Sequence, residues 1–258
     1  MSSAVEQLWT LVRETDAPEQ SLVVVNRTEV DPIQRLLATT FDGQSVDITE
    51  GDVPDAADDT VLLVRDGEVV ASSSLQSVID ACLLVNSDLY RTGPGGLEQS
   101  RASSVITELD QTVFELRGFP AAEKEMEKLI LILISRFIEG HALEHGSGVL
   151  RATFQELSRL GTENDTREVY RRLADTDLSV HVYGVNDWEL PANLDTVLHT
   201  GDHRGYRESW CVLFRPASAE PRHAALLSLE TGPNEWVGTW TYDPQKVRRV
   251  DEILLEEF

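Results

Sequence analysis

Two pairs of histidines have the spacing that most directly suggests chemistry. His141 and His145 stand four residues apart in a segment predicted to be helical, which is the spacing of a two-histidine metal site on one helix face. The metalloproteases with this spacing carry Glu directly after the first histidine, and Ala142 stands there in this chain. Histidine also binds the free carbonyls at helix C-termini. We therefore interpret this pair as structural and expect no metal site.

The second pair, His199 and His203, flanks Asp202 in a polar segment, which we interpret as a solvated loop. The Gly-x-Ser-x-Gly motif of serine hydrolases is absent, and no glycine-rich loop ends in the lysine of a nucleotide-binding site. Cys82 and Cys211 lie in apolar runs, which is typical of buried thiols in a reducing compartment. We expect no catalytic residue, and the sequence indicates no cofactor.

Aromatic residues near the C-terminal end are the remaining candidates. Trp236, Trp240 and Tyr242 fall on one predicted strand at even spacing, so they share one face of it. An aromatic strand face either packs a core or lines a small-ligand pocket with a few directed polar groups. Both interpretations stay open at this point.

The chain is strongly acidic, with 45 Asp and Glu against 22 Lys and Arg and a formal charge of −23. Such a charge repels nucleic acid and anionic membrane surfaces, so we expect neither as a partner. Self-repulsion on this scale is screened in molar salt, where the Debye length is about 3 Å. We expect a halophilic cytoplasm, with an acidic mesophilic protein as the alternative. Residues 1–12 have no signal-peptide pattern, and the most apolar run, residues 129–134, is far shorter than a membrane span.

The periodicity predicts mixed helices and strands in two regions. In the first, a helix over residues 6–13 and a buried strand over 21–25 precede a helix over 31–38, and a hairpin turns at Asp66-Gly67 between strands over 61–64 and 68–72. Further segments of this region are an edge strand over 46–48, a helix over 75–84 and a glycine-rich loop over 91–103.

The second region begins with a strand over 112–117 and a long helix over 121–145. The segments predicted after them are a short strand over 150–155, a helix over 165–174, strands over 178–183, 210–214, 224–229 and 235–242, and a final helix from Asp243 to Leu255. The fold class is therefore α/β of the mixed α+β kind. We expect an N-terminal α/β region over residues 1–100 and a C-terminal domain over 105–258 with a mainly antiparallel sheet flanked by helices.

The segment from Trp236 to Asp243, WVGTWTYD, resembles the closing signature of DICT domains, which are sensory domains of diguanylate cyclases and two-component proteins. Three further pieces follow the family's order: LRATFQ ending at Gln155, VYRRLA containing Tyr170, and ESWCVLF containing Trp210. The apolar helix with Ser135 resembles the family's opening helix. The chain is also similar to a haloarchaeal group that carries residues like 66–73 and 84–90 before the domain.

The resemblance implies a non-catalytic sensor rather than an enzyme. Because no effector domain is recognised in the sequence, we expect ligand-dependent conformational change to reach a separate effector or regulatory protein. The ligand-site residues that this implies are Phe154, Gln155, Tyr170, Trp210, Glu230, Trp240, Tyr242 and Asp243. We expect Phe154 and Trp240 to stack, Gln155 and Glu230 to supply directed polar contacts, and Asp243 to cap the last helix.

Two alternative functions remain. The protein is a regulatory interaction module without a ligand, or it is an unrecognised enzyme whose residue to examine is His181 or His223. Separately, the apolar run over residues 129–138 either packs in the core or forms the seam of a homodimer.

Overall fold

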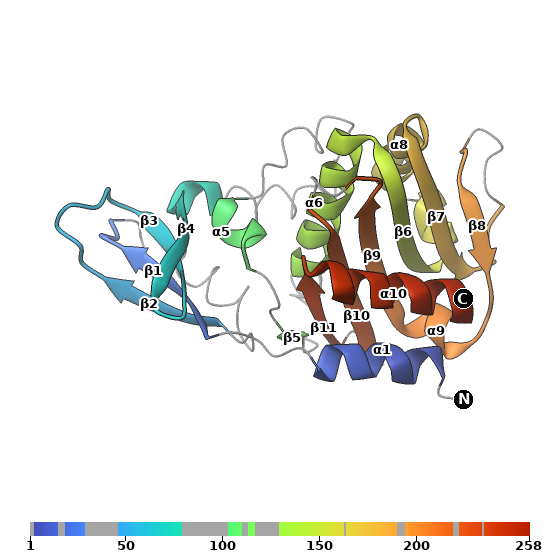
Figure 1. Ribbon diagram of the computed structural model, residues 1–258, viewed down its shortest axis with the longest axis horizontal. Coiled ribbons are helices and arrows are strands. Elements are labelled where there is room, and N and C mark those ends of the chain that lie inside the picture. The colour runs from blue at the N-terminus through green and yellow to red at the C-terminus, as the bar shows by residue number, and fades with distance from the viewer. Residues whose placement is uncertain are drawn as a thin grey trace.

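The computed structural model describes residues 3–14, 19–28, 46–78, 103–109, 113–116, 129–162, 164–189, 194–218, 222–233 and 235–258. These residues form two sheets, with helices packed mainly around the larger one, so the expected mixed α+β class is confirmed. The two sheets belong to two lobes that lie side by side, and the short helix α5 (Ser104–Thr107) lies between them (Figure 1).

The small sheet has the strand order β2-β1-β3-β4. Its strands are β1 (Gln20–Val25), β2 (Val46–Gly51), β3 (Thr60–Arg65) and β4 (Glu68–Ser74). β1 is parallel to β2 and antiparallel to β3, and β3 forms the predicted hairpin with β4. Asp66 and Gly67 both have positive φ, 51° and 82°, which is the requirement of a type I′ turn. The hairpin and the edge position of β2 are therefore as predicted.

The large sheet has the order β5-β11-β10-β9-β6-β7-β8. Its strands are β5 (Val113–Leu116), β6 (Ser147–Glu156), β7 (Asp177–Val185), β8 (Val197–Thr200), β9 (Ser209–Pro216), β10 (Ala224–Gly232) and β11 (Glu235–Thr241). β5, β11, β10, β9 and β6 are antiparallel to their neighbours in that row, whereas β6, β7 and β8 are parallel. The expected antiparallel run near the C-terminal end is confirmed.

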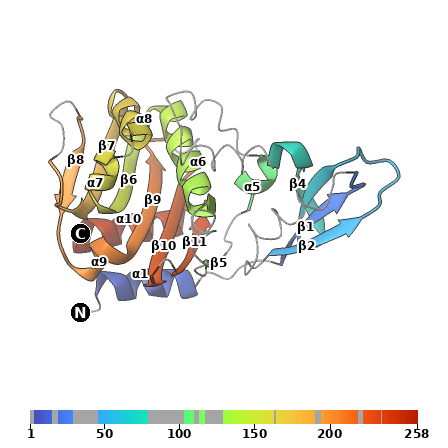
Figure 2. The ribbon, with the colours of Figure 1, turned by 180° about the vertical axis from the view of Figure 1, so that it is seen from behind.

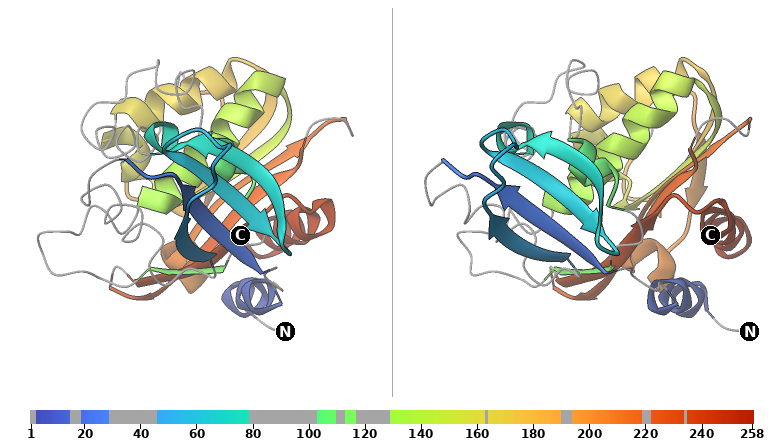
Figure 3. Two further views of the ribbon diagram at one scale, coloured as in Figure 1. Left: turned by 90° about the vertical axis from the view of Figure 1, so that its left-hand side faces the viewer. Right: turned by 60° about the vertical axis from the view of Figure 1, so that its left-hand side comes forward.

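Helices cover both faces of the large sheet (Figures 2 and 3). The first face, called here the α6 face, carries α6 (Leu129–His145), α7 (Ser158–Thr162) and α8 (Asn164–Ala174). The second, the α10 face, carries α1 (Ala4–Arg13), α9 (Arg204–Glu208) and α10 (Pro244–Glu257). Strand residues alternate between the two faces, so Val212 and Leu226 join the core under α6, while Leu213 and Leu227 join the core under α10.

Helix α1 lies on the large lobe, although the next strand in the sequence belongs to the small sheet. Its apolar residues Leu8, Leu11 and Val12 are buried against α10 and the α10 face. A capping box between Ser3 and Glu6 begins the helix, because each side chain accepts a hydrogen bond from the other residue's backbone N–H. Contact with α10 therefore completes the large lobe from the far end of the chain.

Four short elements, α5, α7, β8 and α9, were not predicted, and the loop predicted around His199 and His203 is wrong. Of these, β8 and α9 lie in the segment interpreted as a solvated loop. His199 is on β8 and paired with β7, and His203 caps α9 through its ring nitrogen. Backbone pairing with β7 orders this polar segment, and such pairing leaves no apolar pattern in the sequence. The predicted helix over residues 31–38, Cys82, residues 121–128 and nearly all of the loop over 91–103 lie outside the described residues.

Candidate functional site

Gln155 at the end of β6 has an unusual backbone conformation. Its φ is 54°, in the left-handed region that few residues other than glycine adopt. The pairing of β6 with β7 is irregular between Thr153 and Glu156, so a bulge lies at this position. A non-glycine residue held in this region costs about 1–3 kcal/mol, and such strain is concentrated at functional sites. Gln155 is therefore the natural starting point for a candidate site.

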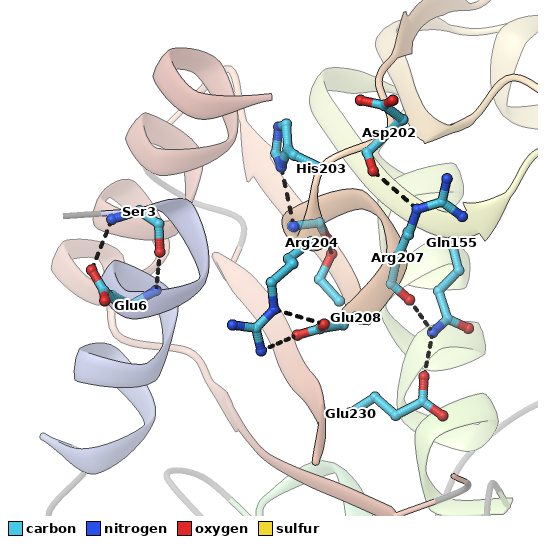
Figure 4. A network of polar contacts seen from close by, with 11 residues as sticks. Ser3, Glu6, Gln155, Asp202, His203, Arg204, Arg207, Glu208 and Glu230 are labelled. Atoms are coloured by element: carbon cyan, nitrogen blue, oxygen red, sulfur yellow. Dashed lines mark hydrogen bonds and ion pairs between the residues drawn. The ribbon is translucent and has the colours of Figure 1, made fainter. Parts of the chain in front are cut away.

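The carboxamide of Gln155 bridges two acceptors (Figure 4). Its Nε2 donates to the backbone carbonyl of Arg207 at 2.6 Å and to Oε2 of Glu230 at 3.0 Å. Because a carbonyl and a carboxylate only accept, the amide orientation is determined by its neighbours. The other amide atom, Oε1, is buried and has no hydrogen-bond partner among the described residues. The side chain is 7% exposed, so this oxygen is an unmet acceptor inside the protein.

Helix α9 positions the carbonyl that Gln155 binds. The ring of His203 accepts from the N–H of Gly205 at 3.1 Å, and Nε of Arg207 donates to the carbonyl of Asp202 at 2.9 Å. Ser209 Oγ donates to the Gly205 carbonyl at 2.7 Å and so holds the end of the helix against β9. Figure 4 shows the contacts of His203 and Arg207 beside the network of Gln155 and Glu230. The short helix is thus a fixed support for the polar part of the site.

Aromatic rings surround this end of the sheet on the α6 face. Trp210 donates from Nε1 to Ser135 Oγ on α6 at 3.0 Å, and its ring meets Trp236 edge to face at 5.9 Å. Phe154 meets Tyr170 on α8 in the same manner at 5.1 Å. Edge-to-face pairs are the preferred geometry for aromatic rings.

A buried carboxylate lies behind the aromatic rings. Glu139 on α6 is 3% exposed, and it accepts from the Tyr170 hydroxyl at 2.9 Å and from Arg136 at 2.7 Å. Arg136 also donates to Thr166 at 2.9 Å, which ties α6 to α8. Burial, together with the adjacent Glu139 charge, raises the pKa of Tyr170 well above its ordinary value. Tyr170 is therefore a hydrogen-bond donor here and not an ionised group.

The expected site residues divide into two groups. Phe154, Gln155, Tyr170, Trp210 and Glu230 belong to the end of the sheet where β6 ends and β9 begins. Trp240, Tyr242 and Asp243 lie toward the opposite end, because Trp240 is in register with Leu226 and Tyr242 and Asp243 follow the last strand.

The contacts within the second group give each of its residues a different role. Trp240 is 1% exposed in the core. Asp243 caps α10 by accepting from the Gln245 N–H at 2.8 Å, as expected. The expected stacking of Phe154 on Trp240 is wrong, because β9 and β10 lie between their strands and three strand spacings amount to about 14 Å.

Tyr242 belongs to a contact between the lobes. The Arg222 guanidinium lies 4.6 Å from the centre of the Tyr242 ring, and the Arg222 carbonyl is 3.0 Å from Nε2 of His141. Arg222 also forms two hydrogen bonds, of 3.0 and 3.2 Å, with the carboxylate of Glu108. The carbonyl of Glu108 in turn accepts from Arg65 on β3 of the small sheet. A continuous set of contacts therefore joins the two lobes.

Helix α6 touches both groups of residues. Ser135 and Glu139 contact Trp210 and Tyr170, while Phe137 meets Tyr242 at 6.2 Å and His141 contacts Arg222. His141 and His145 pack edge to face at 4.5 Å, and burial lowers the pKa of His141. The role of α6 was not predicted in this detail. The signal was present, since Ser135, Arg136 and Glu139 interrupt an otherwise apolar run.

Residues 103–228 match the protein family described as the DICT sensory domain of diguanylate cyclases and two-component systems. This part of the chain therefore belongs to the DICT family, as the resemblance of its motifs implies. The match ends before Trp236, so Glu230, Trp240 and the capping residue Asp243 lie beyond it.

A search of curated proteins finds no match to the chain. One similar solved structure is the polyphosphate kinase of Porphyromonas gingivalis, with 10% identity, a TM-score of 0.29, and coverage of 98% of this chain and 45% of the kinase chain. A likeness this weak supports no argument about fold or function. Among the described residues, no helix is long and apolar enough to cross a membrane.

Proposed function

We propose that this protein is a non-catalytic, ligand-responsive sensor whose site lies at Gln155, Glu230 and the rings of Trp210 and Phe154. The family is sensory, and the observation that carries the proposal is the buried, unmet Oε1 of Gln155 on a strained backbone. A ligand that donates a hydrogen bond to this oxygen would satisfy it. The neighbouring Glu230 carboxylate favours a ligand with N–H donors, and the aromatic rings favour one with a flat apolar part.

The burial of Gln155 Oε1 supports the proposal that ligand binding changes the conformation of the protein. Oε1 is buried, so a ligand reaches it only when the contacts around Gln155 open. The free and bound states then differ in structure, and the ligand binds one of them better, which is the thermodynamic condition for a sensor. Opening also releases the left-handed strain of Gln155, which lowers the cost of the change.

Helix α6 is the proposed route from the site to the small lobe. A shift of Trp210 acts on Ser135, and the same helix holds Tyr242 and Arg222 through Phe137 and His141. The Glu108 carboxylate then passes the change to the small sheet. We propose the small lobe as the surface that a separate effector or regulatory protein recognises, in a halophilic cytoplasm.

Native mass spectrometry of the purified full chain tests the ligand site. We expect a small molecule to be retained on the wild-type protein and lost from a Gln155→Gly variant. The variant keeps its fold, because glycine relieves the positive φ while two hydrogen bonds are lost, a net change of about 1 kcal/mol or less. Gln245→Ala, at an exposed position of α10, is the matched control and should retain the ligand. Equal retention by wild type and Gln155→Gly would contradict the site.

A second variant tests the relay. Arg222→Gln removes the ionic contact with Glu108 and the cation over Tyr242. We expect the ligand to bind this variant, while hydrogen exchange in β3 and β4 no longer responds to it. Ligand-dependent exchange in those strands that survives the substitution would show that the signal takes another route.

A regulatory interaction module without a ligand is the second candidate function. Trp236 and Trp240 are both 1% exposed, as expected for rings that only pack a core. Repeated purification without any retained molecule, combined with capture of a protein partner by the full chain, would favour this candidate.

The halophilic setting has a separate test, which is a salt titration of the unfolding free energy. The net charge of −23 should make stability fall as salt is removed, since repulsion is then unscreened. Full stability at low salt would contradict this setting without affecting the ligand site.

A further inference from the structure

Strand β8, at one edge of the large sheet, is paired with a single neighbouring strand. It forms the edge and pairs with β7 through four residue pairs, from His181 with Val197 to Gly184 with Thr200. Val197 and Leu198 are exposed, so little apolar burial holds the strand in place. Edge strands with few buried contacts open at a lower free energy than the rest of a fold. The side-chain contacts of β8 therefore decide how firmly it is attached.

In addition to this backbone pairing, the His199 side chain of β8 makes a polar contact with the neighbouring strand β7. Its Nε2 lies 2.9 Å from Nδ1 of His181 on β7, and its ring stacks on Tyr183 at 4.2 Å with an angle of 8° between the planes. The other nitrogen of His181 lies 2.9 Å from Ser179 Oγ. A hydrogen bond between two ring nitrogens needs one protonated and one bare nitrogen. If both rings are protonated, two N–H groups face each other and the bond is lost.

We propose that the bond between His181 and His199 is a proton-operated catch, which holds β8 on the sheet at neutral pH and releases it on acidification. This is a second input to the protein, independent of the proposed ligand site.

The charges around the pair favour the neutral rings. The charged and titratable groups on this side come from β6, β7, β9, α10, and α9 with its N-cap, and they are Arg151, Tyr183, Arg215, Asp251, Tyr206 and His203. Arg151 is in register with His181 and donates to the Tyr183 hydroxyl at 2.8 Å. Asp251 would favour a protonated histidine, but Arg151 and Arg215 both bind its carboxylate.

The resulting pKa shifts give the direction of the switch. Burial, with the Arg151 and His199 charges, lowers the pKa of His181 to about 4, and burial with Arg151 also lowers the pKa of His199. When β8 is released, His199 leaves the sheet and His181 on β7 becomes open to solvent, so the pKa values of both rings return toward the ordinary value of about 6.5. The state with β8 released therefore binds more protons, so attachment is complete above that value and weakens as the pH falls toward 4. If His181 alone returned fully to the ordinary value, the opening constant would rise about 20-fold between pH 7 and pH 5.

Hydrogen exchange of the full chain at pH 7, 6 and 5 tests this catch. After correction for the intrinsic exchange rate at each pH, the opening constant of the amides of residues 197–200 should rise about 20-fold. The amides of β10 in the same sheet serve as the internal reference and should change far less. A pH-independent β8, or an equal rise in β8 and β10, would overturn the proposal.

Substitutions separate the catch from general acid sensitivity. The double variant His181→Asn/His199→Gln should lose the pH dependence of β8, while His145→Gln, which alters a histidine on α6, should keep it. A double variant that retains the full dependence would refute the catch. Should the double variant fail to fold, nitrogen-detected NMR titration of the wild-type histidines decides the matter. A His181 that titrates near 6.5 would overturn the proposal, and one that titrates well below it would support it.

Discussion

The two faces of the large sheet bury their residues by different means. On the α6 face, the largest buried side chains are Trp236, Trp240 and Tyr170, and the buried carboxylate of Glu139 is held by a phenol and an arginine. On the α10 face, Arg151 and Asp251 form an ion pair inside the core, with side-chain exposures of 4% and 5%. The α6 face therefore adds large buried rings to its core, and the α10 face adds a fully buried ion pair to a core made largely of aliphatic residues.

The difference separates the two proposed inputs. On the α6 face, the polar network of Gln155 lies near the end of β6, where an amide oxygen without a hydrogen-bond partner among the described residues and nearby aromatic rings suit the proposed ligand. On the α10 face, the His181–His199 pair joins β7 to the edge strand β8, where Arg151 disfavours any added positive charge. The proposed ligand site and the proposed proton-sensitive pair thus lie at different places on one sheet, the first at the end where β6 ends and the second at the edge formed by β8.

The largest expected effect comes from truncating a ring on the α6 face. Trp240→Ala leaves a cavity that α6 and the sheet cannot close, so the free energy of unfolding should fall by about 4 kcal/mol. Chemical denaturation at constant high salt measures this loss. A variant of nearly wild-type stability that binds no ligand would instead show that Trp240 lines the site.

Breaking the ion pair on the α10 face should cost slightly less. Asp251→Ala leaves Arg151 buried without its partner carboxylate, and we expect a loss of about 3 kcal/mol in the same denaturation experiment. The double variant Arg151→Met/Asp251→Leu should recover most of it, because no buried charge remains. Glu14→Gln breaks the half-exposed ion pair with Arg249 and should cost under about 1 kcal/mol. Equal losses in the single and double variants would show that shape, not charge, governs this face.

Removing one hydroxyl group on the α6 face should have an intermediate effect. Tyr170→Phe withdraws a donor from the buried Glu139, which keeps Arg136, and we expect a loss of about 2 kcal/mol. Tyr206→Phe, whose hydroxyl donates to the Phe258 carbonyl in a partly exposed contact, is the control and should lose about half as much. If Tyr170→Phe left the free energy of unfolding unchanged, the hydrogen-bonding needs of Glu139 would be met without the phenol.

The last prediction involves no expected change in the free energy of unfolding and concerns the reactivity of a buried thiol. Cys211 on β9 is fully buried, and burial raises the pKa of its thiol to about 12. In a Cys82→Ser variant at pH 8, labelling by a disulfide reagent should be roughly a thousand-fold slower than in denaturant, since so little thiolate is present. Rapid labelling under native conditions would show that β9 opens readily.

Much of the fold follows from local patterns. The Asp66-Gly67 turn, the alternation in β9 to β11 and the cap at Asp243 were predicted because each depends on residues that are neighbours in the sequence. The eight expected site residues were predicted as one group, and five of them belong to one end of the sheet.

Other features depend on partners that are distant in the sequence. Gln155 is turned by a bulge and held by the carbonyl of Arg207, a residue with no motif of its own. The polar sequence around His199 predicts a loop, because the contacts that stabilise its strand are the pairing with β7 and the bond to His181, and neither leaves a local pattern. Phe154 and Trp240 are both aromatic, but they do not contact each other, because β9 and β10 lie between their strands.

The sequence by itself determined the acidic net charge, the mixed fold class, the strands of the large sheet other than β8, and the sensory family of residues 103–228, since charge, periodicity and motif are properties of local residue order. Only the tertiary structure decided that α1 completes the large lobe, that Gln155 faces Glu230 and that two histidines on neighbouring strands share a hydrogen bond. These contacts arise from the order and register of the strands, which depend on burial summed over the whole sheet and not on any one segment.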